Sequence, residues 1–135
     1  MISFNYETNF ALVNEKEVSE WLSKVITSEG FNEGEITYFF CNDNDLLKLN
    51  VQHLNHNTLT DIISFDYTVG GYIHGDIFIS VDRVRENSHE LEINFDEELR
   101  RVMVHGILHY CGYRDKNEDE IKQMREKENY YIHLH

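Results

Sequence analysis

Hydrophobic residues recur along this chain at two spacings, every second position in some segments and every third or fourth in others. These two patterns predict four strands and five helices. Four segments alternate or are rich in β-branched and aromatic residues, and we expect them to form strands; they are Ile2–Tyr6, Glu35–Cys41, Asp61–Tyr67 and Tyr72–Ser80. Five segments repeat apolar residues every three or four positions, as amphipathic helices do; they are Glu15–Ser28, Asn44–Leu54, Asp82–His89, Phe95–Cys111 and Glu118–Tyr131.

The resulting order, in which strands and helices first alternate and three helices come last, is typical of an α+β fold. We expect one small mixed β-sheet of about four strands packed against about five helices. Gly70 and Gly71 predict a hairpin turn between the last two strands. The chain of 135 residues has no repeat or linker, and we expect residues 1–135 to form a single domain.

The charge of the chain restricts the partners it can have. The formal net charge is −13, whereas proteins that simply bind nucleic acids present a basic surface. The charge is uneven, because residues 1–82 hold three basic and 13 acidic side chains while residues 83–135 hold nine and 12. A contact with a polyanion should therefore use the C-terminal part of the chain.

The sequence carries no signal for a membrane or for secretion. No run approaches the roughly 18 apolar residues of a membrane span, and the N-terminal segment lacks the basic-then-apolar layout of a secretory signal. Cys41 and Cys111 lie far apart and outside any CxxC pattern, which favours free thiols in a reducing compartment. We therefore expect a cytoplasmic protein without membrane contact.

Two histidines and an aspartate near the C-terminus have the spacing of a metal site. His105 and His109 lie four residues apart in a predicted helix, so both imidazoles project from one face. Gly112 can take the left-handed conformation that ends a helix and reverses the chain, and Asp115 then supplies a carboxylate oxygen. The pattern H-x3-H-x2-G-x2-D has the spacing of the metzincin zinc sites. It predicts a divalent-metal site with three protein ligands and an open position for water.

One residue separates this pattern from that of the metalloproteases. Those enzymes carry a glutamate directly after the first histidine as a general base, and this chain has Gly106 there. The spacing therefore predicts a metal site without the base of a peptidase. Helix histidines that are merely hydrogen-bonded, with no metal, are the alternative.

Several segments resemble a known family. The run HGILHYCGY, from His105 to Tyr113, resembles the signature H-G-x-L-H-L-x-G-Y-D-H of the YbeY family, bacterial endoribonucleases tied to ribosomal RNA maturation. Three further segments resemble the family's L-N pair, its T-D-V-L-S-F segment and its G-D-I-x-I-S strand; they are Leu49–Asn50, Thr60–Phe65 and Gly75–Ser80. The similarity covers roughly residues 40 to 128, in consistent order.

The resemblance implies a fold, a metal and a substrate. The fold would be α+β with the metal helix packed on the sheet, and the metal a zinc-type ion that three histidines hold in the family. His105 and His109 match two of these, the third falls at Asp115, and Arg114 stands at the preceding aspartate. Two histidines and a carboxylate suit Zn2+, and also Fe2+, Ni2+ or Mn2+. The implied substrate is RNA, a ribosomal RNA precursor, and the implied partners are ribosomal proteins or an assembly GTPase.

The chain departs from the family where an arginine is thought to contact RNA phosphate. The family has a Y-R pair after its L-N segment, and this sequence has His53 and Leu54 there. Leucine cannot donate hydrogen bonds to phosphate. Either Arg101, one helical turn before the first histidine, or Arg114 or Lys116 makes this contact instead, or the RNA activity is weak.

Two aspartates near predicted strand ends are candidates for a role in catalysis. Asp61 and Asp76 could orient a histidine or accept a proton. Hydrogen bonding in turns or caps is the alternative for both. We keep Asp76, with Arg101 and Arg114, as candidate catalytic residues.

Two functions are compatible with these observations. The first is a metal-dependent endoribonuclease of ribosomal RNA processing, which hydrolyses phosphodiester bonds with metal-activated water. The alternative is a non-catalytic, metal-containing factor of ribosome assembly or protein binding, whose metal pins the last two helices to the sheet. The acidic charge and the missing arginine favour the alternative.

Overall fold

The structure, a computed structural model, describes residues 1–54 and 59–134, with the backbone alone for Leu54. The replacement of the family arginine by Leu54 therefore lies outside the described side chains. None of the described helices is long and apolar enough to cross a membrane.

Four strands form one mixed sheet in the order β1-β2-β4-β3. β1 (Ile2–Tyr6) runs parallel to β2 (Asn32–Cys41), and β2 runs parallel to β4 (Tyr72–Ser80). β3 (Ile62–Asp66) is antiparallel to β4 and forms one edge. The two glycines between β3 and β4 have positive φ angles of 59° and 80°, so the predicted hairpin turn is confirmed.

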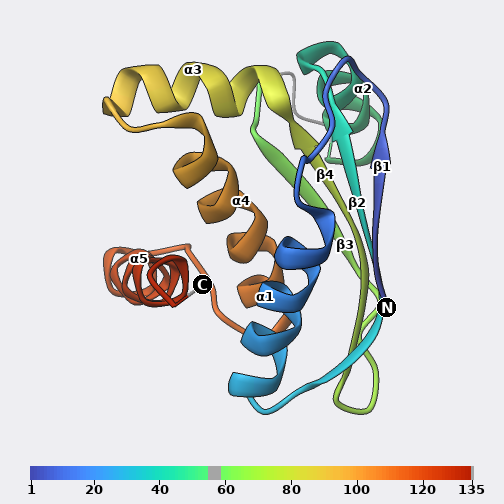
Figure 1. Ribbon diagram of the computed structural model, residues 1–135, viewed down its shortest axis with the longest axis vertical. Helices are drawn as coiled ribbons and strands as arrows, with labels where there is room; N and C mark the ends of the chain where they lie inside the picture. The colour runs from blue at the N-terminus through green and yellow to red at the C-terminus, as the bar shows by residue number, and fades with distance from the viewer. Residues whose placement is uncertain (55–58, 135) are drawn as a thin grey trace.

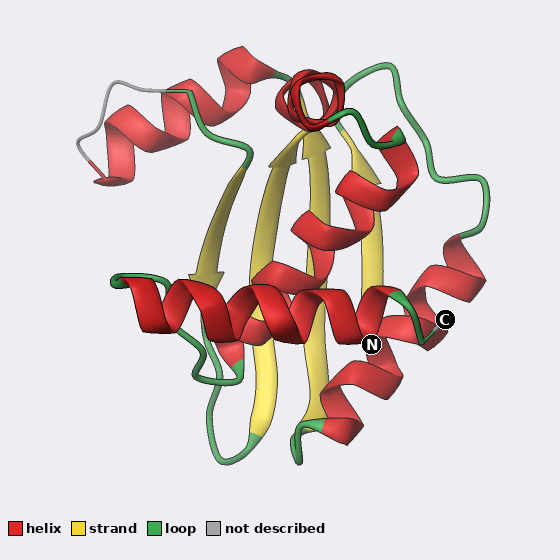
Figure 2. Cartoon of the chain, turned by 90° about the vertical axis from the view of Figure 1, so that its left-hand side faces the viewer, coloured by secondary structure: helices red, strands yellow, loops and turns green. Residues whose placement is uncertain are grey.

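The described residues form five helices besides the sheet: α1 (Glu15–Ser28), α2 (Asp43–Leu54), α3 (Val81–Leu91), α4 (Phe95–Tyr110) and α5 (Glu118–Ile132). Figure 1 shows α1 and α4 against one face of the sheet, with α5 on the far side of α4. In Figure 2 the helices of this side lie in front of the strands. α2 packs on the opposite face, where Leu46 is buried with Cys41 and Ile63. The predicted α+β class, with four strands and five helices, is confirmed.

The sequence pattern predicted most boundaries to within two residues, and β2 is the exception. It begins at Asn32 rather than at Glu35 because its parallel pairing with β4 continues, across an irregularity between Glu33 and Ile36, to Tyr72. Gly34 permits this close approach, since a Cβ there would lie 2.4 Å from the ring of His74.

Two glycines set how closely α4 lies on the sheet. A Cβ at Gly106 would lie 3.0 Å from Ile77 Cδ1, so the helix axis is near its limit of approach. A Cβ at Gly75 would overlap the Tyr110 ring. The Tyr110 hydroxyl reaches backbone carbonyls of β3 and β4, each at 3.0 Å, and these contacts fix the C-terminal end of α4 on the sheet.

Candidate metal centre

His105, His109 and Asp115 bring three donor atoms together at the C-terminal end of α4. The two Nε2 atoms are 3.0 Å apart, and Asp115 Oδ2 lies 3.4 Å from His105 Nε2 and 3.3 Å from His109 Nε2. Within residues 1–54 and 59–134 this is the one group of three histidine, cysteine or carboxylate side chains that could hold a metal. Ligands about 2.0–2.2 Å from a tetrahedral ion lie about 3.3 Å from one another, so the spacing fits one ion.

The turn after α4 delivers Asp115 to the two histidines. Gly112 has a φ angle of +103°, which an L side chain rarely adopts. Its N–H donates to the carbonyl of His109 at 3.0 Å, and the N–H of Tyr113 donates to that of Leu108 at 3.1 Å. This pair of hydrogen bonds is a Schellman motif, which closes the helix and turns the chain back. The reversal predicted at Gly112 is confirmed.

The turn also fixes the ring of His109. His109 Nδ1 lies 2.9 Å from the backbone oxygen of Tyr113. A carbonyl oxygen only accepts hydrogen bonds, so Nδ1 is assigned the proton and Nε2 keeps its lone pair. That lone pair is the one directed toward His105 and Asp115.

Tyr113 is itself anchored by a carboxylate at the end of α1. Its hydroxyl donates to Glu29 Oε1 at 2.6 Å, the hydroxyl of Tyr131 donates to Glu29 Oε2, and Lys127 Nζ lies 3.4 Å from that oxygen. Burial raises the pKa of Glu29, but the two tyrosine hydrogen bonds and the lysine charge outweigh it and hold the pKa below its ordinary value. These hydrogen bonds and the lysine form a cluster around Glu29, here called the node, which joins α1, α5 and the turn that carries Asp115.

The ring of His105 is oriented by a side chain rather than by the backbone, namely a buried carboxylate on α5. Glu128 is 4% exposed, and its Oε2 lies 2.6 Å from His105 Nδ1. Its second oxygen, Oε1, accepts a hydrogen bond from Arg101 Nη1 at 3.2 Å, and Arg125 Nη1 lies 3.6 Å from it. Burial lowers the pKa of His105, but Glu128, with Asp115 and Asp61, raises it above its ordinary value.

The point where the two Nε2 atoms and Asp115 meet is suited to a cation. Both Nδ1 atoms face acceptors, so in the neutral rings both Nε2 atoms present lone pairs to each other and to the Asp115 carboxylate. Three electron-pair donors within 3.4 Å repel one another unless a proton or a metal ion lies between them. Two imidazoles and a carboxylate are a donor set for a divalent transition metal, with room for further ligands.

The two arginines suggested by the sequence lie in different surroundings. The Arg101 side chain is only 15% exposed, and besides Glu128 it donates to Asn129 Oδ1 at 2.9 Å. Its Nε also lies 3.6 Å from Glu98 Oε1, so its charge is paired with carboxylates of both α4 and α5. Arg114 is exposed and adjoins Asp115, so its guanidinium is accessible from solvent beside the candidate ligands.

The structure does not bring Asp76 to the histidines. Ile77 faces α4, where it lies against Gly106, and alternation along β4 turns Asp76 to the other face of the sheet. Asp61 lies nearer. Its charge acts on His105, its Oδ2 is 3.4 Å from Asn87 Nδ2, and burial raises its pKa.

Glu128 and Glu29 are not predicted by the sequence motif, although the sequence carries a signal for one of them. Glu128 falls on the apolar stripe of α5, four residues after Met124 and three before Tyr131, both of which are buried. A charged residue within such a stripe requires a buried partner. Glu29, at the end of α1, carries no comparable signal, because its partners lie 84 and more residues away in the sequence.

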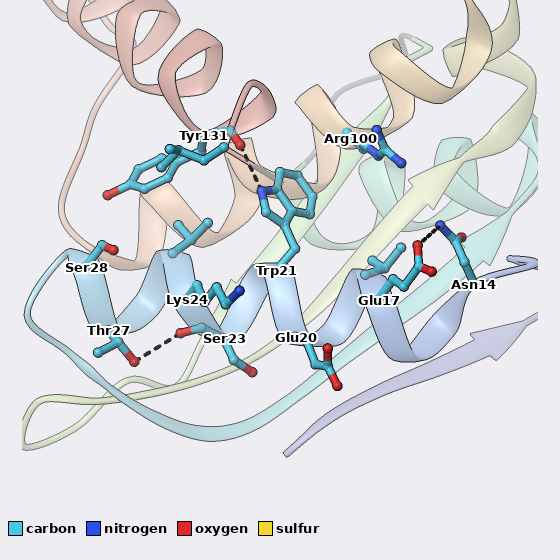
Figure 3. Close-up of a pocket in the computed structure, with 13 residues that line it drawn as sticks. Asn14, Glu17, Glu20, Trp21, Ser23, Lys24, Thr27, Ser28, Arg100 and Tyr131 are labelled. Atoms are coloured by element: carbon cyan, nitrogen blue, oxygen red, sulfur yellow. Dashed lines mark hydrogen bonds between the residues drawn. The ribbon is translucent and has the colours of Figure 1, made fainter.

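A groove of about 660 Å3 lies away from these ligands, between α1, α4 and the end of α5. Figure 3 shows Trp21 at its centre, with the indole Nε1 donating to the backbone oxygen of Tyr131 at 2.8 Å. Neither histidine nor Asp115 lines it. The candidate metal ligands thus lie outside this groove.

Comparison with known proteins shows the family of this chain. A family model described as endoribonuclease YbeY matches residues 3–134. The endoribonuclease YbeY of Flavobacterium johnsoniae is 60% identical over 129 residues, which cover 96% of this chain and 93% of the relative. That of Flavobacterium psychrophilum is 56% identical over 134 residues, covering 99% and 96%.

A solved structure shares the fold. The solution structure of TM1509 from Thermotoga maritima matches with a TM-score of 0.71 and 28% identity, and the match covers 98% of this chain and 87% of that one. The family match and the two relatives extend over nearly the whole sequence. This chain belongs to the endoribonuclease YbeY family.

Proposed function

We propose that this protein is a metal-dependent endoribonuclease that acts in the maturation of ribosomal RNA. The observation that carries the proposal is the convergence of His105, His109 and Asp115 on one point, in a chain of the endoribonuclease YbeY family. Membership of that family favours the enzyme over a non-catalytic assembly factor. Residues 1–135 would form the one catalytic domain, working in the cytoplasm on a ribosomal RNA precursor.

The two histidines and the aspartate would hold a zinc ion. When bound, such an ion polarises a phosphoryl oxygen and lowers the pKa of water at the same site. The Asp115 carboxylate adds a negative charge that a third histidine would not, which broadens the choice of ion to Fe2+, Ni2+ or Mn2+. Elemental analysis of gently purified protein distinguishes these ions.

The remaining task of the site is to hold a phosphodiester beside the ligands. Arg114 and Lys116 both adjoin Asp115 and are exposed. Arg114 is the better suited, because its planar guanidinium can donate two hydrogen bonds to one phosphate. Arg101 is less suited, because its guanidinium already contacts Glu128 and Asn129. The C-terminal region, which is less acidic than the rest of the chain, would then meet the RNA.

Partners belong to the same proposal. Ribosomal proteins or an assembly GTPase would bring the enzyme to its substrate, which suits a chain whose net charge of −13 gives little affinity for RNA by itself. Co-purification with ribosomal particles tests this part separately from the chemistry.

The enzymatic proposal is tested by cleavage of a structured ribosomal RNA fragment. Wild-type protein loaded with Zn2+ is expected to cleave it, and Asp115→Ala and a chelator are each expected to abolish cleavage. The exposed Asp119→Ala variant is the control and should keep activity. Equal activity of the wild type and Asp115→Ala would indicate a contaminating nuclease and support the non-catalytic alternative.

A further inference from the structure

We propose that Glu128, held by Arg101, is a positioning residue that orients His105 and sets the affinity of the centre for its metal. The inference concerns the same centre and therefore rests on the proposed function. It assigns to α5, 23 residues after the first histidine, a part in metal binding that the ligand motif does not contain.

The contact between Glu128 and His105 is short and buried. The Oε2–Nδ1 distance is 2.6 Å, and Glu128 is 4% exposed. A carboxylate that accepts the Nδ1 proton fixes the tautomer, directs Nε2 away from itself and makes that nitrogen a stronger donor. In this structure Nε2 is directed at His109 and Asp115, so the orientation that Glu128 imposes is the one that a ligand needs.

Packing alone does not explain a glutamate at this position. The other buried residues of α5 are Met124, Tyr131 and Ile132, and an apolar residue here would extend that stripe against α4. Burying an ionised carboxylate is unfavourable unless it is paired and hydrogen-bonded. The position therefore favours a role that only a carboxylate can fill.

Arg101 holds the carboxylate in place. It donates to the oxygen that His105 does not use, at 3.2 Å, and a second hydrogen bond from the same nitrogen to Asn129 keeps the guanidinium against α5. It lies on α4 one helical turn before His105 and its Nε is 3.6 Å from Glu98 Oε1, so the guanidinium is held from both helices while it bonds Glu128 beside the imidazole. We assign Arg101 to this set of contacts rather than to the substrate.

His109 provides an internal comparison. Its Nδ1 partner is the backbone oxygen of Tyr113, which a side-chain substitution leaves in place. Removing the Glu128 carboxylate should therefore weaken one ligand and leave the other histidine and Asp115 oriented. The expected result is a partial loss of metal affinity, in contrast to the complete loss that removal of a ligand would cause.

The test measures the Zn2+ dissociation constant of the full chain by competition with a chromogenic chelator, without RNA. Glu128→Gln, which keeps the shape of the side chain, is expected to bind Zn2+ 10- to 100-fold more weakly than wild type. Glu126→Gln, an exposed change on the same helix, is the matched control and should bind like wild type. A loss of less than tenfold in Glu128→Gln, or an equal loss in Glu126→Gln, would overturn the proposal.

A second measurement does not depend on whether the variant folds. Nitrogen-15 NMR of wild-type protein loaded with Zn2+ should show His105 protonated at Nδ1 and metal-bound at Nε2, and the opposite assignment would overturn the proposal. Neither measurement uses RNA cleavage, so a protein that binds Zn2+ as expected but cleaves no RNA would contradict the proposed function alone. In an active enzyme with saturating Zn2+, Glu128→Gln should lower kcat and leave KM for RNA unchanged.

Discussion

His109 Nδ1 lies 2.9 Å from the backbone oxygen of Tyr113, four residues further along the chain. The turn that delivers Asp115 therefore also orients the second histidine, so the geometry of two ligands depends on one segment of backbone. Glu29, at the end of α1, accepts hydrogen bonds from the hydroxyl of Tyr113 and from that of Tyr131 on α5, and so ties the same segment to both helices. The ligand positions are thus determined by the packing of three helices as well as by the motif.

Gly112→Ala should damage both the turn and the metal site. A φ angle of +103° is strained for an L residue, so we expect a loss of about 1–2 kcal/mol in the free energy of unfolding. Relaxation of the turn would displace Asp115 and weaken Zn2+ binding. Gly70→Ala is the matched control, because it also has a positive φ angle, 59°, but lies in the β3–β4 hairpin. If both variants lost Zn2+ affinity equally, the turn would have no specific part in metal binding.

Arg114→Ala should weaken RNA binding and leave Zn2+ binding intact. Loss of one charge-assisted contact to phosphate should raise KM about tenfold. It should also reduce the slope of log affinity against log salt concentration by about one. Lys122→Ala removes an exposed charge from α5 and serves as the control for net charge. An unchanged salt slope in Arg114→Ala would exclude this arginine as the phosphate contact.

Glu29→Gln should change how stability depends on pH. Since the pKa of Glu29 is lowered in the folded protein, its ionised form stabilises the fold above the ordinary value of 4.5, and this stabilisation is lost as the pH falls through the folded-state pKa. At pH 7 we expect Glu29→Gln to be less stable by about 1.5–3 kcal/mol, the usual contribution of hydrogen bonds to a charged group. The difference from wild type should shrink below about pH 4.5.

Urea unfolding of both proteins between pH 3 and pH 7 measures this dependence. Glu20→Gln, an exposed change on α1, is the control and should follow wild type at every pH. A difference between wild type and Glu29→Gln that stayed constant with pH would show that the Glu29 charge does not stabilise the node.

The spacing of the hydrophobic residues predicted most helices and strands, because most of these elements are amphipathic. α1 was predicted residue by residue, since its five buried side chains recur at helical spacing on one face. The start of β2 was not predicted, because residues 32–34 (NEG) have no β signal of their own and are strand only through pairing with β4. Side chains alternate between the two faces of a strand, so once Ile77 is assigned to the face that α4 covers, Asp76 must point to the opposite face, away from the histidines.

The metal ligands could be predicted from sequence because they lie within eleven residues, on one helix and the turn that follows it. Their supporting groups could not, because His105 and Glu128 are 23 residues apart and meet only when α5 packs across α4. Arg101 is an example of a residue whose role depends on contacts that form only on folding. Its spacing from His105 suggested a substrate contact, whereas in the folded chain its guanidinium is bonded to α5.

The central claim, a single metal centre formed by His105, His109 and Asp115, is tested most directly by metal content. Wild-type protein and the His109→Ala variant would be purified without chelator and analysed for zinc, iron, nickel and manganese, with the exposed His89→Ala as control. We predict about one ion per chain in wild type and in His89→Ala, and almost none in a His109→Ala protein that keeps its circular dichroism spectrum. Undiminished metal content in folded His109→Ala would contradict the site.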